Sequence, residues 1–517
     1  MAIDLNTFQL PNGWANTNGT NQSQQRILVL DLGDVLFHYD SASNLTALSR
    51  QELQAVLLSN TWTELDRGHI GEDEALARIG KVLSLDPKAI KEGLSQCRKT
   101  LRVDQDIIDG ISKLKKELNG KLKVYAMSNI SKHDFVHLKS ILSDWSLFDG
   151  EFISCEAGMA KPELNFFKHV LEKIGVSNPS SVIFIDDKII NVTSARSLGI
   201  QGIIFKSSKT MFRQLRNLLF DPVVRGRRYM SANARKHTSQ IEGGPEFSDV
   251  FSQVLIHYEL KDPSLLNLSS PDASEAQIKA DIRSATTDAK TWNYFNGTAV
   301  GTTKHFPDDV DDTALALLAF SPPAASSNAI LDRMIANRHD KDNLIMIYFC
   351  EERQRLCPFV TVNVLRVFYH YGRGAEVKGE LDHVRDVLLN RGYIYGTCVY
   401  NSAEPFLYFM ACLIHANPDQ PEIQCLREPV AAALRERVGR QDDSFAVAAR
   451  VLSCQKLGVW AQSDIEYLKE MQECDGGWEI GWLCHYNRSH KRIGNRGVPT
   501  AWAIKALEHQ YRVHGEP

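Results

Sequence analysis

The sequence predicts a multidomain protein, with an N-terminal α/β domain built on a doubly wound sheet and a C-terminal all-α domain. The chain has 517 residues, which is too many for one ordinary hydrophobic core. Short aliphatic runs alternate with amphipathic helical stretches up to about residue 215, as in a parallel sheet covered by helices. Beyond about residue 246, helical periodicity replaces the strand pattern and indicates an α-helical domain.

The composition is that of a globular cytoplasmic protein. Hydrophobic residues make up 43% of the chain and charged residues 24%, and the net charge of −4 gives no general attraction to nucleic acid or anionic membranes. We find no apolar run long enough to span a membrane and no N-terminal secretory signal. The 10 cysteines are scattered without zinc-ligand spacing, so we expect free thiols in a reducing cytosol. The sequence does not give the oligomeric state.

Three aliphatic runs in the N-terminal half predict buried parallel strands. They follow a polar segment at residues 1–25, which we expect to be a flexible leader. The runs are residues 26–30, 122–127 and 181–185. Directly after them come polar residues, namely Asp31, Ser128 with Asn129, and Asp186 with Asp187. Each of these alone is more often a turn or capping residue, but open α/β sheets bind ligands at the carboxyl ends of their strands.

The strand-end residues occur in a recognisable order together with a lysine that precedes a proline. This order resembles that of haloacid dehalogenase-like (HAD) phosphohydrolases and runs Asp31, Ser128, Lys161, Asp186. The resemblance covers residues 26–215 and includes a helical cap insertion at about residues 40–105. It implies that the N-terminal domain is a phosphatase domain.

The resemblance to HAD phosphohydrolases implies a role for each residue of the site. Asp31 would attack phosphorus and form an aspartyl-phosphate, while Ser128 and Lys161 would hold the phosphoryl oxygens. Asn129 would lie in the same substrate-binding site. Mg²⁺ prefers oxygen ligands, and the resemblance gives it Asp31, the Gly33 carbonyl, Asp186 and Asp187.

One position departs from the usual HAD pattern. Most phosphatases of this family carry an acidic residue two positions after the nucleophile, and this chain has Gly33 there, with Asp34 one position further on. Loss of a general acid costs roughly 10²–10⁴ in rate. The sequence therefore leaves open an active phosphatase, a slow one and an inactive one.

A change in composition separates the two halves at residues 216–246, where basic residues and glycines predict a linker. The C-terminal domain then covers residues 247–517. Its apolar residues recur at helical spacing in five stretches: 313–320, 360–371, 404–415, 443–457 and 498–511. Short loops join these stretches, which fits an α-barrel of helical hairpins. A helical repeat scaffold would look similar, but we find no fixed-period consensus.

Four carboxylates lie within five residues at the start of the first of these helices: Asp308, Asp309, Asp311 and Asp312. Like charges this close cannot all ionise in a partly buried site, so at least one of these carboxyl groups should have a pKa above the ordinary value for aspartate. A carboxylic acid that stays protonated at neutral pH is a proton donor. The alternative is an acidic helix start whose carboxylates cap free N–H groups.

The acid run and a second motif resemble those of class II terpene cyclases. The pattern Asp309-x-Asp311-Asp312 is similar to the motif that protonates an alkene in that family. Residues 472–478 resemble the Gln…Gly-Trp motif of squalene-cyclase-type α-barrels, which has a structural role there. The resemblance implies that Asp311 donates the proton and that Asp309 and Asp312 keep it oriented and protonated.

A carbocation and a diphosphate each require particular side chains. Aromatic faces stabilise a cation without acting as a base, and among many aromatics that are also candidates for the core we nominate Trp292, Tyr294 and Tyr348. Basic residues would bind the diphosphate, and the candidates are Lys304, His305, Arg353, Arg355, Arg488, Arg492 and Arg496. The sequence does not choose between these clusters, and each could equally be a solvated basic loop.

The fusion of the two halves resembles the HAD-like sesquiterpene synthases. That family implies cyclisation of farnesyl diphosphate to a drimane-type bicyclic diphosphate, drimenyl or albicanyl, and hydrolysis to the alcohol with Mg²⁺. Several members carry Asp-x-Asp-Thr-Thr, whereas residues 309–313 here read Asp-Val-Asp-Asp-Thr. Two alternatives remain: a cyclase that releases the diphosphate beside an inactive HAD domain, and a phosphatase with a helical binding scaffold.

Overall fold

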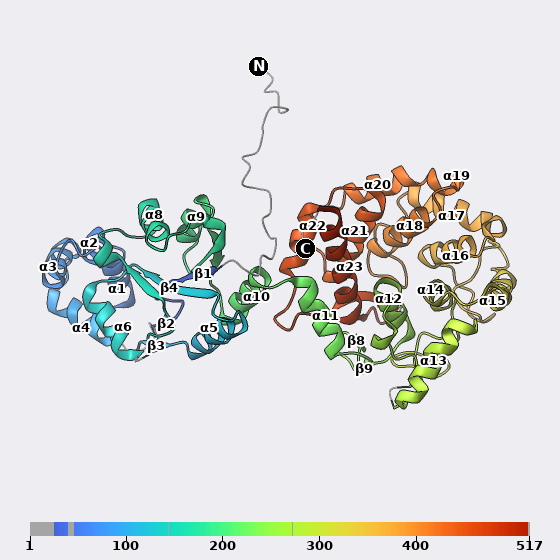
Figure 1. The fold of residues 1–517 in the computed structure, drawn as a ribbon, viewed down its shortest axis with the longest axis horizontal. Helices are drawn as coiled ribbons and strands as arrows, with labels where there is room; N and C mark the ends of the chain where they lie inside the picture. Colours follow the sequence, from blue (N-terminus) through green and yellow to red (C-terminus); the bar gives the residue numbers. More distant parts are fainter. Residues whose placement is uncertain (1–24, 40–45, 143, 271, 487, 515–517) are drawn as a thin grey trace, which may run out of the picture. The chain divides into compact units, whose positions relative to one another are not determined.

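The computed structural model describes residues 25–39, 46–142, 144–270, 272–486 and 488–514 (Figure 1). The leader expected at residues 1–25 lies outside these ranges except for Gln25. The described residues form two compact units, one ending at Leu219 and the other beginning at Phe220. No described helix is both long enough and apolar enough to cross a bilayer.

The N-terminal unit is built on a five-stranded parallel sheet with the strand order β5-β4-β1-β6-β7. The strands are β1 (Arg26–Leu30), β4 (Leu122–Ser128), β5 (Gly150–Ile153), β6 (Val182–Asp186) and β7 (Gln201–Ile204). The three expected strands are the central ones, because continuous aliphatic runs suit strands that are covered on both faces. The sequence pattern missed the two edge strands, which have four residues each, include a glycine and are only partly buried.

Helices flank this sheet, and a separate helical insertion follows the first strand (Figure 1). The flanking helices are α5 (Gln105–Glu117), α6 (Lys132–Ile141), α7 (Ser154–Ala157), α8 (Leu164–Lys173), α9 (Ile189–Ser197) and α10 (Ser208–Leu219). The insertion contains α1 (Arg50–Leu57), α2 (Asn60–Asp66), α3 (Glu72–Leu83) and α4 (Pro87–Arg98). Strands β2 (Phe37–His38) and β3 (Arg102–Val103) pair at its base. The insertion has its own apolar core, which includes Trp62 and Leu76.

Residues 216–246 are not a linker, which corrects the boundary expected from composition. They contain the end of α10, then α11 (Pro222–Ala232), β8 (Ser239–Ile241) and the start of β9 (Glu246–Phe247). At least one of the basic residues that suggested a linker is inside the fold. Arg225 is buried, and its guanidinium donates to Gln472 Oε1 over 2.9 Å. A buried guanidinium requires such partners, so residues 220–246 belong to the fold of the second unit.

The C-terminal unit is an α/α barrel. Its inner ring contains α12 (Val250–Leu260), α14 (Val310–Phe320), α16 (Pro358–His370), α18 (Glu404–Ala416), α21 (Ser444–Leu457) and α23 (Gly497–His514). Each helix contacts the next, and α12 contacts α23, so these six described helices close a ring. Outside them lie α13 (Glu275–Thr287), α15 (Ala324–Ala336), α17 (Lys378–Leu389), α19 (Pro421–Gln424), α20 (Arg427–Arg435) and α22 (Gln462–Glu470). The five helical stretches expected from periodicity are five of the six inner helices.

A small antiparallel sheet accompanies the barrel and was not expected. Its strand order is β10-β11-β8-β9, with β10 (Gly481–His485) and β11 (Arg492–Asn495) as its second hairpin. Glycines interrupt the apolar pattern of this hairpin, and a side chain at Gly494 would meet the Gly481 carbonyl at 2.2 Å. Close backbone approach therefore explains both the glycines and the weak strand signal.

The segment 472–478 makes the contacts of a structural motif. Gln472 donates to the carbonyls of Pro222 and Gly476, both over 2.8 Å. The Trp478 side chain is fully buried and its indole N–H donates to the Leu468 carbonyl over 2.7 Å. The motif thus ties α22 to the turn that follows and to the first helix of this unit.

Candidate functional site

The carboxyl edge of the parallel sheet gathers four of the expected residues. Asp31 follows β1, and Ser128 and Asp186 end the two strands that pair with it. Lys161 comes from the loop before α8 and is buried among them. Its ammonium lies 2.9 Å from Asp31 Oδ1, 2.6 Å from Asp186 Oδ2 and 3.0 Å from the Met127 carbonyl.

Burial and charge pairing set the protonation of this cluster. Burial raises the pKa of Asp31 to about 6, against the opposing attraction of Lys161, and the nearby Asp186 charge adds to the rise. Burial alone would lower the pKa of Lys161, but the two carboxylates outweigh it and raise that pKa. The lysine therefore stays charged and favours the anionic form of the Asp31 carboxylate.

Two asparagines hold the cluster in place. Asn129 accepts from the Lys161 backbone N–H over 2.8 Å and donates to the Lys161 carbonyl over 2.7 Å. Both polar atoms of this amide therefore orient the lysine, and the substrate contact expected from the sequence stays a prediction. The Asn191 side chain donates to both oxygens of Asp186, over 2.9 Å and 3.0 Å.

Three carboxylates at this edge could hold a metal ion. Ligand oxygens of Asp31, Asp186 and Asp187 all lie within 4.8 Å of one another. The Oδ1 atom of Asp187 is buried and has no hydrogen-bond partner among the described residues. An unpaired buried carboxylate oxygen is costly, and a hard divalent cation would satisfy it.

Gly33, where most HAD phosphatases carry a second acidic residue, is surrounded by open space. A Cβ atom built on Gly33 would meet no atom within 4 Å. Asp34, the alternative acid, is exposed and adopts a left-handed conformation with a φ of 56°. Its backbone N–H closes a turn onto the Phe37 carbonyl over 2.8 Å. No described side chain from residues 33 or 34 therefore replaces the usual general acid inside the buried cluster.

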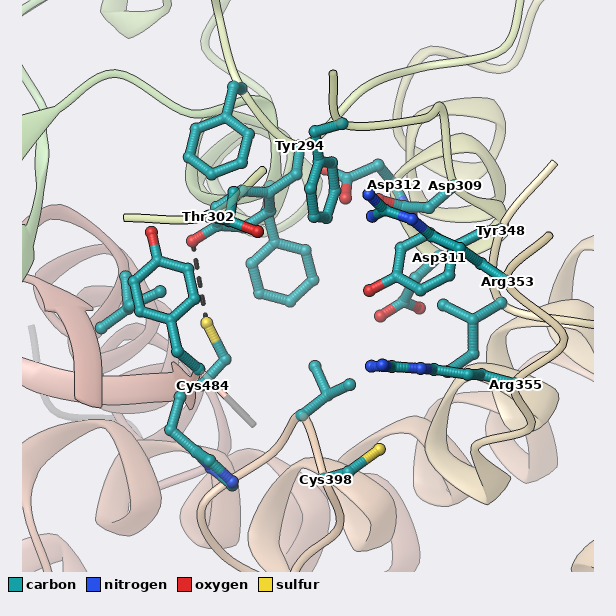
Figure 2. A pocket seen from close by; sticks show the side chains of 18 of the residues that line it. Tyr294, Thr302, Asp309, Asp311, Asp312, Tyr348, Arg353, Arg355, Cys398 and Cys484 are labelled. Carbon is teal, nitrogen blue, oxygen red and sulfur yellow. Dashed lines mark hydrogen bonds between the residues drawn. The ribbon is translucent and has the colours of Figure 1, made fainter. Parts of the chain in front are cut away.

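The barrel contains a cavity of about 650 Å³, a volume typical of small-molecule sites (Figure 2). Asp309, Asp311 and Asp312 all lie on its wall at the start of α14. Asp309 caps this helix, because its Oδ1 accepts the backbone N–H of Asp312 over 2.8 Å. The capping interpretation of the acidic run therefore holds for Asp309, while Asp311 has other partners.

Asp311 receives two buried hydrogen bonds. Asn363 Nδ2 donates to its Oδ1 over 2.7 Å, and the Tyr400 hydroxyl donates to its Oδ2. Arg366 in turn donates to Asn363 Oδ1 over 2.7 Å and lies over the rings of Tyr258 and Phe409. Because a guanidinium only donates, the Asn363 oxygen must face Arg366 and its amide group must face Asp311.

These partners were not found by sequence reasoning. Asn363 and Arg366 lie on the apolar stretch of α16. Their spacing of three positions on one helix was the only sequence signal that could have indicated a buried polar pair. Tyr400 precedes α18 in a loop, and its ring is fully buried against Phe359 and Phe251.

All three carboxyl groups on the cavity wall are held toward the protonated form. Burial raises the pKa of Asp309 to about 7, and the neighbouring Asp311 charge contributes to the rise. Burial also raises the pKa of Asp312 well above its ordinary value, with repulsion from Asp309 as the next cause. The pKa of Asp311 is raised by burial too, but the bonds from Tyr400 and Asn363 and the Arg366 charge oppose the rise. Asp311 is therefore the group whose anion is best stabilised.

Two of the three nominated aromatics line the cavity. Tyr294 and Tyr348 are on its wall, whereas Trp292 is buried outside it and stacks on Phe320 with ring centroids 6.5 Å apart. Trp292 instead supports the acid motif, since its carbonyl accepts the Asp309 N–H over 2.9 Å. Further aromatic residues on the wall are Phe251, Phe295, Phe306, Tyr400 and Tyr486.

The structure separates the candidate cations into two groups. The cavity is lined by Arg353, Arg355 and Arg488. It is not lined by Lys304, His305, Arg492 or Arg496. Arg492 pairs with Glu242 over 3.0 Å, and Arg496 forms two bonds of 2.8 Å to Asp475. These two arginines are engaged in the fold, and the exposed Lys304 and His305 belong to the loop beside the cavity.

Arg353 is also partly engaged by this loop. Its guanidinium donates to Thr303 Oγ1 over 2.5 Å and to the His305 carbonyl over 3.3 Å. It also lies over the rings of Phe306 and Tyr348. Arg355 and Arg488 are exposed at the cavity.

Known proteins match both units of the chain. Residues 24–199 match the haloacid dehalogenase-like hydrolase family, and residues 223–371 match the sesquiterpene cyclase astC-like C-terminal domain. A solved HAD family enzyme from Bacteroides thetaiotaomicron, a magnesium complex, aligns at 25% identity and a TM-score of 0.31 over 37% of this chain and 98% of its own.

Two curated relatives cover the chain to different extents. Sesquiterpene phosphatase astK of Aspergillus oryzae is 34% identical over 37% of this chain and 95% of its own length. Drimenol cyclase drtB of Aspergillus calidoustus is 39% identical over 93% of this chain and 88% of its own length. This chain therefore belongs to the family of sesquiterpene cyclases that combine a haloacid dehalogenase-like domain with a terpene cyclase domain, the family of drimenol cyclase.

Proposed function

We propose that the protein is a bifunctional sesquiterpene synthase that converts farnesyl diphosphate to a bicyclic drimane-type alcohol. The barrel cyclises the substrate by protonation, and the HAD unit hydrolyses the diphosphate of the product. The observation that carries the proposal is the buried Asp311, hydrogen-bonded on the wall of an aromatic cavity of about 650 Å³. The likeness to drimenol cyclase over 93% of the chain supports the drimane skeleton.

Asp311 is the proposed proton donor. A protonated Asp311 transfers its proton to the terminal alkene, and the remaining alkenes close two rings by forming two carbon–carbon bonds. Tyr400 and Asn363 stabilise the aspartate that is left, which makes Asp311 a stronger acid than Asp312 and hence a better donor to a weakly basic alkene. The aromatic wall stabilises the tertiary cations without offering them a nucleophile.

Asp31 is the proposed nucleophile of the phosphatase. Its carboxylate attacks the terminal phosphorus while the bond from that phosphorus to the bridging oxygen breaks and the organic monophosphate leaves, and water then hydrolyses the aspartyl-phosphate to inorganic phosphate. Ser128 and Lys161 stabilise the charge on the phosphoryl oxygens. The oxygen atoms of Asp31, Asp186 and Asp187 and the Gly33 carbonyl would hold Mg²⁺. When bound, this ion supplies further neutralisation of the phosphoryl charge. Two turnovers remove the β-phosphate and then the α-phosphate.

A single incubation distinguishes the proposal from its alternatives. Purified protein is supplied with farnesyl diphosphate and Mg²⁺, and organic and phosphorylated products are separated by mass spectrometry. A bicyclic alcohol supports the bifunctional enzyme. A bicyclic diphosphate alone would mean an inactive HAD unit, and farnesol alone would mean a phosphatase with a helical scaffold.

The exposed cavity arginines are expected to bind the diphosphate. Arg355→Gln and Arg488→Gln should each raise the KM for farnesyl diphosphate by about 10-fold or more, since a charge-assisted hydrogen bond contributes about 1.5–3 kcal/mol. Steady-state kinetics of bicyclic product formation measures the effect. Arg492→Gln is the matched control, because Arg492 pairs with Glu242 outside the cavity lining. A KM that changes equally in all three variants would show a general charge effect instead.

Tyr400→Phe is expected to weaken the acid and shift its pH dependence. The acid acts in its protonated form, so wild-type cyclisation should decline as pH rises through the pKa values of the carboxyl group cluster. Tyr400 lowers the pKa of Asp311, so its loss should move this decline to higher pH and reduce the rate by about 10–100-fold. The measurement is product formation against pH. Tyr486→Phe, whose hydroxyl bonds the Val300 carbonyl, should leave the midpoint of the decline unchanged.

A further inference from the structure

His485 lies on the cavity wall at the end of β10, and its tautomer is fixed by one neighbour. Its Nδ1 lies 2.6 Å from Asn401 Oδ1. The Asn401 amide donates to the carbonyls of Cys484, over 2.9 Å, and Trp482, over 3.3 Å, so its oxygen must face the imidazole. The proton of the neutral ring therefore resides on Nδ1, and Nε2 carries the lone pair.

This lone pair is available. No described residue hydrogen-bonds to His485 Nε2, and partial burial, with repulsion from the His490 ring as the second cause, lowers the pKa of His485. The other cavity groups on this side are poor bases: burial raises the pKa of the Cys484 thiol to about 12 and that of the Tyr294 hydroxyl well above its ordinary value. Among the described residues of the lining, His485 is the one imidazole.

His485 and the acid come from different segments of the cavity wall, since His485 ends β10 and Asp311 lies in the first turn of α14. Figure 2 shows Cys484, its neighbour in sequence, across the open space from Asp311. Arg488, three residues after His485, also lines the cavity and is one of the two arginines assigned above to the diphosphate. The imidazole therefore shares the cavity wall with one of the two arginines proposed to bind the diphosphate.

The chemistry of the cyclisation requires a base other than the acid. After two ring closures the positive charge lies on a tertiary carbon only two bonds from the carbon that bears the diphosphate. The reaction ends when an adjacent carbon loses a proton. The carbon that loses this proton is in or attached to the second ring, and the carbon that Asp311 protonated is in the first. Asp311 is therefore poorly placed to accept the proton released in the final step.

We propose that His485 is the catalytic base that ends the cyclisation, an inference that rests on the proposed cyclase function. Nε2 takes the proton from the carbon next to the cation, and the electrons of the broken C–H bond form the alkene. One proton enters from Asp311 and one leaves to His485, so the bicyclic diphosphate has the same composition as the substrate. The partly exposed imidazolium then returns its proton to water.

The test is the product distribution of His485→Gln and His485→Ala beside wild type. Each protein is incubated with farnesyl diphosphate and Mg²⁺, residual phosphate esters are cleaved with added phosphatase, and the alcohols are quantified by mass spectrometry. Both variants should still consume substrate by cyclisation, because protonation precedes the step that is lost. The share of the wild-type alkene should fall by about 10-fold or more, replaced by isomeric alkenes and by bicyclic diols from capture of the cation by water.

His490→Gln is the matched control, since this ring lies 6.1 Å from that of His485 but does not line the cavity. It should keep the wild-type distribution. An unchanged distribution in both His485 variants would overturn the assignment and leave the diphosphate oxygens as the base. Loss of all cyclisation in His485→Gln with an unchanged melting temperature would also overturn it, because that result marks a binding residue. If wild type itself forms no bicyclic product, the cyclase function fails and this inference fails with it.

Discussion

The Asp311→Asn variant is expected to form no bicyclic product while it still releases phosphate from farnesyl diphosphate. Asparagine keeps the size of the side chain and its oxygen can still accept a bond from Asn363 or Tyr400, but it has no acidic proton for the alkene. Cyclisation should fall by about 10³-fold or more, on the order of the upper range for a lost general acid. Chromatography of the organic products and a phosphate assay measure the two activities in one reaction.

Asp308→Asn is the matched control for this variant. Asp308 directly precedes the motif and accepts from the Thr291 hydroxyl over 2.6 Å, but it does not line the cavity. It should keep cyclisation close to wild type. Persistent bicyclic product in Asp311→Asn would transfer the donor role to Asp312, whose pKa burial raises well above its ordinary value.

The Asp31→Asn variant is expected to accumulate the bicyclic diphosphate. An amide cannot form the aspartyl-phosphate, so alcohol output should fall by about 10³-fold or more, the scale seen when a covalent nucleophile is removed. The cyclase cavity is in the other unit and contains neither Asp31 nor Lys161, so cyclisation should continue at the wild-type rate. Mass spectrometry of the intact diphosphate gives the readout.

Treatment of the Asp31→Asn reaction with an added phosphatase should restore the same alcohol that wild type makes. This control separates a lost hydrolysis step from a changed cyclisation. Unchanged alcohol output without added phosphatase would remove the HAD site from the mechanism. It would also make the open space at Gly33 the mark of an inactive unit.

The elements that sequence patterns located are those with one dominant physical signal. The central strand at Arg26–Leu30 is covered on both faces and reads as a continuous aliphatic run. Helix α14 was located from its acidic start and apolar continuation. The hairpin that contains Gly481 and Gly494 was missed, because its pairing depends on close backbone approach and leaves little side-chain pattern. Residues 216–246 resembled a linker for a similar reason, since the partner of Arg225 is Gln472, 247 residues away.

The two fold classes, the order of the phosphatase residues and the acid motif could be predicted from the sequence alone, because each depends on residues that are close along the chain or follow successive strands. The side chains that act on those groups became known from the three-dimensional fold. Asn363 and Tyr400 are 52 and 89 residues from Asp311, yet their bonds distinguish its carboxyl from that of Asp312. The arginines proposed to bind the diphosphate were likewise selected by the fold, because only some of the candidates line the cavity. Such long-range contacts carry no periodic or spacing signal, since burial and hydrogen bonding across a barrel depend on how its helices pack.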